Sequence, residues 1–220
     1  MKTSGAKFNE RALTLVEVLV VIAAITILAA VLLPALTGSG RSLRTVCMSN
    51  LKQIDLGFLM YSSDFAGKYP MQVSAKDGGT SEFIYTSHTF PHFEKIQKYI
   101  PGQQFYGLLV CPLDKARKAA TNSETFTDLN ISYFLNVDCS TKGTSQSLLA
   151  GDRNLTTDGY TTLSGTLIVT TNINLRWTQE IHLKGGNLAF ADGHAEWCQS
   201  ANMNNIIRQQ PTATNRLSIP

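Results

Sequence analysis

The feature that most constrains this chain of 220 residues is an apolar run near its amino terminus, LTLVEVLVVIAAITILAAVLLPAL over residues 13–36. Its uninterrupted part, residues 18–36, has 19 residues without a charge and spans roughly 28 Å as a helix, close to the hydrocarbon thickness of a bilayer. One carboxylate, Glu17, lies at its amino-terminal edge. Because a charge at mid-membrane costs roughly 2.5–3.5 kcal/mol, this carboxylate needs a partner. The run predicts a helix that crosses a membrane or fills an apolar assembly core.

Residues 12–17, Ala–Leu–Thr–Leu–Val–Glu, resemble the processing site of type IV prepilins and type II secretion pseudopilins. The resemblance implies that prepilin peptidase, a membrane aspartyl peptidase, cleaves between Ala12 and Leu13 and that the new amino group of Leu13 is methylated. It also implies that Glu17 pairs with the amino group of a neighbouring subunit, which sets the register of assembly. Ala12 and Leu13 stand where glycine and phenylalanine are usual, so we expect slower processing at most.

The leader, residues 1–12, has three basic residues and one acidic residue, which predicts a cytoplasmic amino terminus. We therefore expect a single-pass protein of the bacterial inner membrane, with its carboxy-terminal head in the periplasm or outside the cell. A secretory signal cleaved near residues 37–40 and an untrimmed signal anchor remain alternatives. The apolar run is longer than the 7–15 residues of an ordinary secretory signal.

Helical periodicity continues beyond the apolar run. Apolar residues recur in steps of three or four, which is typical of an amphipathic helix. They are Leu43, Val46, Cys47, Leu51, Ile54, Phe58 and Tyr61. The pattern predicts one long helix over residues 13–63, loosened near residues 38–40 and ended by the glycine and proline of residues 67–70.

Four segments follow from these observations. They are a cytoplasmic leader (1–12), a transmembrane or filament-core helix (13–36), its amphipathic continuation (37–65) and a mostly β head (66–220).

In the head, short segments of strand character alternate with clusters of Gly, Asn, Asp and Pro, which is typical of an antiparallel sheet. These segments are residues 83–85, 105–110, 131–136, 147–150, 161–171, 187–191 and 195–198. Residues 93–100 predict a short helix, and residues 201–220 predict a helical turn followed by a loose tail. The fold class is therefore α+β, a long amino-terminal helix packed on a carboxy-terminal antiparallel sheet, which is a pilin-like architecture.

The stretch IHLKGGNLAFADGHAEW, residues 181–197, resembles the H-x9-DG motif of a large prepilin-like family, with the motif at residues 182–193. The phrases CMSNLKQI (47–54), CPLD (111–114) and LAGDRN (149–154) are further landmarks of that resemblance. Asp192–Gly193 indicates a hairpin turn, and Gly185–Gly186 the turn before it. We expect His182 beside this hairpin, hydrogen-bonded to its backbone.

A metal site is an alternative to this structural interpretation. His182, Asp192 and His194 fall within 13 positions, and His and Asp are good metal ligands. Calcium is a weaker option through Asp192, Asp152 and Asp158, because no ligand-loop spacing supports it. We favour the structural turn, and we expect no cofactor.

All four cysteines lie beyond the apolar run, so the predicted topology places them where disulfides persist. Three sets of pairings are possible. We favour Cys47–Cys111, which would tie the long helix to the head, with Cys139–Cys198 second. Four buried thiols remain the alternative.

The function that these features predict is a pseudopilin-like subunit of a type II secretion or type IV pilus-like filament. Its partners would be prepilin peptidase, other pilin or pseudopilin subunits, the inner-membrane assembly machinery and membrane lipid. A membrane-anchored periplasmic or surface binding protein, which uses the prepilin signal only for delivery, is the alternative. Enzymatic activity is not expected, since hydrolase, metalloprotease and phosphate-loop motifs are missing. Nucleic-acid binding is not expected either, because no basic patch has interleaved aromatic residues.

Overall fold

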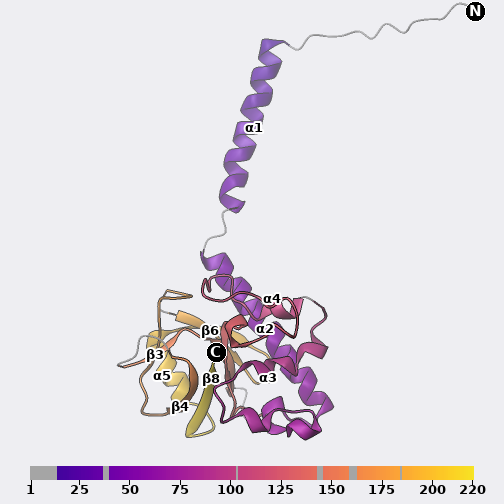
Figure 1. Cartoon of the computed structure of the whole chain (residues 1–220). Coiled ribbons are helices and arrows are strands. Elements are labelled where there is room, and N and C mark those ends of the chain that lie inside the picture. The colour runs from indigo at the N-terminus through magenta and orange to yellow at the C-terminus, as the bar shows by residue number, and fades with distance from the viewer. Residues whose placement is uncertain (1–13, 37–39, 103, 143–145, 159–162, 184) are drawn as a thin grey trace, which may run out of the picture. The chain divides into compact units, whose positions relative to one another are not determined.

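The computed structural model describes residues 14–36, 40–102, 104–142, 146–158, 163–183 and 185–220 (Figure 1). Within these ranges, side chains are described except at residues 30–36, 40 and 41. The chain forms two compact units, Met1–Ser39 and Gly40–Pro220.

The first unit contains the helix α1 (Leu15–Leu36). The second unit begins with the helix α2 (Gly40–Asp64). The helix predicted over residues 13–63 is therefore present as α1 and α2, and residues 37–39 between them lie outside the described residues. The predicted leader, residues 1–12, also lies outside them.

One face of α2 is buried in the second unit. The side chains of Cys47, Leu51, Ile54 and Phe58 have no exposed surface, so the face predicted from the spacing is confirmed. Val46 belongs to the same spacing but is 42% exposed. Beyond Asp64 the chain leaves the helix, and the predicted end near residues 67–70 is confirmed.

A six-stranded antiparallel sheet forms the centre of the second unit, with strand order β4-β8-β1-β2-β6-β7. Its strands are β1 (Tyr133–Asn136), β2 (Leu148–Asp152), β4 (Gly165–Thr170), β6 (Gly185–Phe190), β7 (Ala195–Gln199) and β8 (Thr214–Ile219). A two-stranded sheet pairs β3 (Leu155–Thr157) with β5 (Leu175–Trp177). The predicted α+β class, with a helix packed on an antiparallel sheet, is confirmed.

Short helices fill the segment between α2 and β1, and one helix lies near the carboxyl end. The α-helices are α3 (Phe90–Glu94), α4 (Gln104–Leu108) and α5 (Ser200–Arg208). The 3-10 helices are η1 (Pro70–Gln72), η2 (Ala75–Asp77), η3 (Ser81–Phe83), η4 (Gln97–Tyr99) and η5 (Asp128–Asn130).

Two hydrophobic clusters lie on opposite faces of the sheet. Successive strand residues point to opposite faces, so Phe134 and Leu135 of β1, both fully buried, belong to different clusters. The first cluster joins the sheet to α2, and the second joins it to α5 and β5. In Figure 1, α5 and α2 accordingly lie on opposite sides of the sheet. Because β1, β2 and β6 are buried throughout, they form the middle of a three-layer arrangement.

Several predicted elements are wrong. Residues 83–85 and 105–110 form no strand; they overlap η3 and α4, because a short apolar run does not by itself distinguish a strand from a buried helical turn. Residues 93–100 are divided between α3 and η4. The predicted loose tail instead contains β8, which pairs with both β1 and β4. Its signal was the alternation of Leu217 and Ile219, which are buried.

Candidate functional site

The first described residues form a helix cap. Thr14 precedes α1, and the Glu17 carboxylate oxygen Oε2 accepts hydrogen bonds from the Thr14 backbone N–H and hydroxyl, both at 2.8 Å. The Thr14 hydroxyl oxygen in turn accepts from the Glu17 backbone N–H at 3.3 Å. This is a capping box, in which Thr and Glu three residues apart satisfy each other's backbone donors. The sequence shows its signature, T-x-x-E, so this local role of Glu17 could have been predicted. Ala12 and Leu13, the predicted cleavage site, lie outside the described residues.

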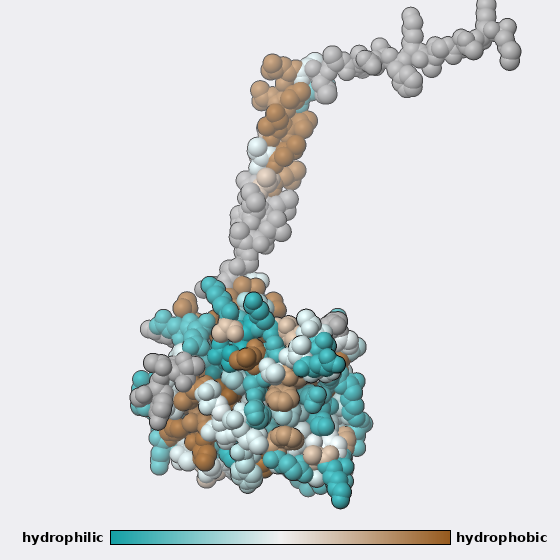
Figure 2. Space-filling model, in the orientation of Figure 1, coloured by the Kyte–Doolittle hydropathy of each residue, from teal (hydrophilic) through white to brown (hydrophobic). Residues whose placement is uncertain are grey.

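The surface of α1 is apolar and exposed over the residues whose side chains are described. Leu15 is 79% exposed and Ile27 is 66% exposed, and Figure 2 shows the described part of this helix as an apolar surface. An exposed apolar surface of this kind marks a site of contact with lipid or with another protein. In the part of the chain that the structure describes, no helix has both the length and the apolar character needed to cross a membrane. The predicted single pass is therefore not confirmed.

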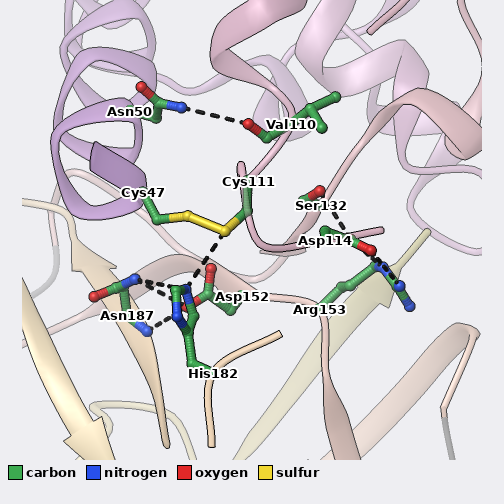
Figure 3. Close-up of a disulfide and its surroundings, with 10 residues drawn as sticks. All are labelled: Cys47, Asn50, Val110, Cys111, Asp114, Ser132, Asp152, Arg153, His182 and Asn187. Atoms are coloured by element: carbon green, nitrogen blue, oxygen red, sulfur yellow. Dashed lines mark hydrogen bonds and ion pairs between the residues drawn. A yellow bond between two sulfur atoms is a disulfide. The ribbon is translucent and has the colours of Figure 1, made fainter. Parts of the chain in front are cut away.

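In the second unit, sequence landmarks that are far apart along the chain meet around one disulfide (Figure 3). Cys47 of α2 is bonded to Cys111, which lies just after α4, across 64 positions. Three residues further along α2, the Asn50 side-chain amide donates to the backbone oxygen of Val110 at 3.5 Å. The disulfide therefore ties the CMSNLKQI phrase to the CPLD phrase, and the pairing favoured from the sequence is the one present.

His182 lies against this disulfide. Its Nε2 atom is 3.5 Å from the Cys111 Sγ atom, 3.4 Å from an Asp152 carboxylate oxygen and 3.4 Å from the Asn187 side-chain nitrogen. The ring also meets the Trp197 ring edge to face, with centroids 5.7 Å apart. His182 lies beside the hairpin as predicted, and its backbone oxygen accepts a hydrogen bond from the backbone N–H of Gly185 at 3.1 Å. The side-chain ring contacts side chains from β2 and β6.

Both ionisable groups of this contact are shifted by burial. Burial raises the pKa of Asp152 to about 7, although the backbone and side-chain N–H groups of Asn187, at 2.5 and 3.1 Å, act to lower it. Burial lowers the pKa of His182 to about 4, and the positive charge of Arg44 acts in the same direction. The imidazole is therefore neutral at physiological pH, with a lone pair able to accept a hydrogen bond or bind a metal.

The next residue of the LAGDRN phrase makes a second long-range pair. Arg153 binds Asp114 of the CPLD phrase with two hydrogen bonds, Nε at 2.7 Å and a terminal nitrogen at 2.8 Å, and both side chains are buried. The Ser132 hydroxyl donates to the same carboxylate at 2.8 Å. Burial acts to raise the pKa of Asp114, but Arg153 and Ser132 outweigh it and hold the pKa below 3.8. Three of the landmark phrases thus converge on one buried cluster.

The Asp192–Gly193 turn closes the hairpin between β6 and β7, as predicted. Gly193 has φ +94°, a conformation that side-chain-bearing residues rarely adopt. Asp192 accepts hydrogen bonds from the backbone N–H and the Nδ1 atom of His194, at 3.1 and 2.5 Å. The predicted turn at Gly185–Gly186 is wrong, because both residues belong to β6. A side chain at Gly186 would place its Cβ 2.5 Å from the Trp177 ring.

The predicted metal ligands are not brought together. His194 bonds its neighbour Asp192, whereas His182 contacts Asp152. Asp158, the third carboxylate of the calcium option, is exposed and pairs with an arginine of β5. Among the described residues, one group of at least three potential ligands has its atoms within 4.8 Å of one another. It contains Cys47, Cys111, Asp152 and His182.

Cys139 and Cys198 are buried thiols, so the second predicted disulfide is wrong. Cys139 belongs to the cluster on the α2 face of the sheet, and Cys198 belongs to the cluster on the α5 face. The sheet therefore separates the two thiols. Burial raises the pKa of both thiols, to about 12 for Cys139 and about 11 for Cys198, so both are protonated and unreactive at neutral pH.

The described chain thus has an apolar helix with a capped amino-terminal end, followed by an α+β unit. Residues 7–33 match a family model described as "Prokaryotic N-terminal methylation motif". No curated protein and no solved structure matches the chain. The chain thus carries the type IV prepilin signature, the motif of membrane-anchored proteins that prepilin peptidase processes. The match ends at residue 33, so the H-x9-DG resemblance of residues 182–193 stays a prediction.

Proposed function

We propose that the processed chain is a pseudopilin-like subunit of a type II secretion or type IV pilus-like filament. The observation that carries this proposal is the match of residues 7–33 to the methylation motif. In the proposal, prepilin peptidase cleaves between Ala12 and Leu13, and the methylated chain stays in the bacterial inner membrane until the assembly machinery adds it to a filament. The head has a structural role and no catalytic one.

The exposed apolar surface of α1 supports assembly through this helix. Packing α1 among its copies would bury large aliphatic side chains that are exposed in the single chain, and van der Waals packing of this kind drives association of apolar helices. The Glu17 carboxylate supports the same step. Both hydrogen bonds from Thr14 go to one of its oxygens, Oε2. Because a carboxylate accepts about four hydrogen bonds, Glu17 can keep its cap and also accept a hydrogen bond from the amino group of a neighbouring subunit.

The Cys47–Cys111 disulfide supports a head outside the cytoplasm. Disulfides persist in the periplasm and at the cell surface, and are rare in the reducing cytosol. The amino terminus would then be cytoplasmic, as the basic leader predicts.

The first test is the intact mass and amino-terminal sequence of the protein recovered from its native membrane. A chain that starts at methylated Leu13 is expected. A chain that starts at Met1 or near Gly38 would refute processing as a prepilin.

Substitution of Glu17 tests filament assembly and separates it from simple anchoring. Glutamine can replace glutamate in a capping box, so Glu17→Gln keeps the cap but removes the charge, whereas Glu17→Ala removes both. In cells that express the whole machinery, a filament subunit requires the charge, so both variants should fail to assemble. Glu10→Ala is the matched control, because cleavage removes this carboxylate. Normal assembly of both Glu17 variants would refute this role of the charge. Wild type and variants that all stay in the membrane without assembling would favour the alternative, a membrane-anchored binding protein.

A further inference from the structure

The four potential ligands around the disulfide form a buried set drawn from separate parts of the fold. Cys47 comes from α2, Cys111 from the loop after α4, Asp152 from β2, and His182 from the segment before β6. Their ligand atoms all lie within 4.8 Å of one another, and all four residues are buried (Figure 3). Two thiolates, an imidazole and a carboxylate are a donor set that zinc accepts in four-coordinate sites.

The contacts of His182 have the lengths of tetrahedron edges. Zinc lies about 2.0–2.3 Å from N, O and S ligands, so neighbouring ligand atoms in a tetrahedral site are about 3.4–3.7 Å apart. The His182 Nε2 atom is 3.4 Å from the Asp152 Oδ2 atom and 3.5 Å from the Cys111 sulfur. Two edges of a zinc tetrahedron are thus present. The edge between the two sulfur atoms is shortened by their bond.

The Asp152 carboxylate supplies an independent observation. It is fully buried, and its Oδ1 atom has no hydrogen-bond partner among the described residues. A buried polar atom without a partner is costly, and such atoms in native proteins frequently mark a bound ion or water. The other oxygen, Oδ2, forms the 3.4 Å edge with His182 and also accepts from the backbone and side-chain N–H groups of Asn187; ligating carboxylates are commonly hydrogen-bonded in this way.

We propose that these four side chains bind one zinc-class divalent cation when the Cys47–Cys111 bond is reduced. A dithiol reductant supplies two electrons and two protons, which break the sulfur–sulfur bond and give two thiols, while the dithiol becomes a disulfide. On binding the cation, each thiol loses its proton to solvent and ligates as a thiolate. Asp152 and His182 complete the tetrahedron.

The cation and the disulfide are then alternative links between the same two parts of the fold. Each joins α2 to the head, and each requires both sulfur atoms, so one excludes the other. The bound cation with two thiolates and one carboxylate would carry a net negative charge. Arg44 of α2 is placed to offset it, since its guanidinium stacks 4.2 Å from the centre of the Trp197 ring, which itself packs on His182. A newly made chain, still reduced, would be held in its folded register by the cation.

The test uses the full chain in detergent, with Cys139→Ser and Cys198→Ser as the background so that the other thiols contribute nothing. The protein is reduced with a phosphine and titrated anaerobically with Co²⁺ and then Zn²⁺. We expect the reduced protein to bind one Co²⁺, with thiolate charge-transfer absorption and the intense visible bands of tetrahedral cobalt, and Zn²⁺ to displace it. The unreduced protein should show neither absorption. A reduced protein without these bands would overturn the proposal.

Ligand variants test the geometry. Asp152→Asn and His182→Gln should each weaken Zn²⁺ binding about tenfold or more. Exposed Asp192→Asn, outside the site, should leave it unchanged. Equal affinity in all three variants would overturn the assignment.

A measurement on the unsubstituted chain does not depend on the folding of any variant. Zn²⁺ should slow alkylation of reduced Cys47 and Cys111 about tenfold or more, mapped by mass spectrometry, while Cys139 and Cys198 react at an unchanged rate. Protection of the latter pair alone, or of no cysteine, would overturn the proposal.

Discussion

Asp55 of α2 should make the head less stable as the pH rises. Its side chain is fully buried in contact with the first hydrophobic cluster, and neither carboxylate oxygen has a hydrogen-bond partner among the described residues. Burial raises its pKa from 3.8 to about 7, and the negative charge of Asp192 in the hairpin turn adds to the effect. The other ionisable groups near Asp55 are Tyr69 and Cys139, whose pKa values are themselves raised by burial. Both are neutral throughout the relevant range.

The sign and size of the effect follow from proton linkage. Between pH 3.8 and about 7 the unfolded chain has released the proton of Asp55 while the folded chain still holds it, so the free energy of unfolding falls as the pH rises. One pH unit across this interval corresponds to 1.36 kcal/mol, which gives a total loss of about 4 kcal/mol by pH 8. The amide of Asp55→Asn does not ionise. The free energy of unfolding of the variant, relative to that of the wild type, should therefore rise by up to about 4 kcal/mol between pH 4 and pH 8.

Tryptophan fluorescence during urea unfolding of the full chain in mild detergent measures this difference. The two tryptophans of the chain, Trp177 and Trp197, both lie in the second unit, so the signal reports its unfolding alone. Asp77→Asn, at an exposed position of η2, is the matched control and should follow the wild type. Asp152, with a pKa also raised to about 7, is present in the wild type and in both variants, so its effect on stability cancels from the comparison. Parallel pH profiles for the wild type and Asp55→Asn would refute the reasoning.

Three further perturbations have defined outcomes in the same unfolding assay. Arg153→Met leaves the buried Asp114 carboxylate without its bidentate partner and should destabilise the head by about 3–5 kcal/mol, whereas a loss below about 1 kcal/mol would mean that water replaces the guanidinium. Gly186→Ala forces a methyl group against the Trp177 ring and should cost about 1–3 kcal/mol with a shift in the fluorescence maximum; an unchanged midpoint would contradict the close approach. Burial lowers the pKa of His92 to about 4, so the folded chain keeps the imidazole neutral. The free energy of unfolding therefore falls by about 3 kcal/mol as the pH falls from 6.5 to 4. His92→Gln should remove this loss of stability at acid pH. The same loss in wild type and variant between pH 6.5 and pH 4 would contradict the prediction.

The elements predicted correctly are those with a local signal. The face of α2 follows from steps of three and four residues, and the β6–β7 hairpin follows from Asp192–Gly193 between two alternating segments. The two segments wrongly predicted as strands are short apolar runs. Residues 105–110 are compatible with a strand or a buried helical turn, and only their surroundings decide. For β8, polar residues near the chain terminus concealed an alternating pair of buried aliphatic side chains.

The candidate site was only partly predictable for a different reason. The sequence marked its phrases as landmarks, and it favoured the Cys47–Cys111 bond, but periodicity contains no information on which phrases meet. Arg153 and Asp114 are 39 positions apart, and His182 and Cys111 are 71 positions apart. The metal hypothesis accordingly grouped His182 with the residues nearest to it in sequence. The fold places it with Asp152 instead.

The burial of α2 determines where the chain can be cut. A recombinant fragment that begins at residue 66 would lack Leu51, Ile54 and Phe58, each with no exposed surface, and would leave Cys111 without its disulfide partner. Such a fragment should aggregate or refold into an altered core. A fragment that begins at Gly40 keeps the whole compact unit and omits the exposed apolar helix α1. Crystallisation, antibody production and ligand screening of the second unit should therefore start from Gly40–Pro220.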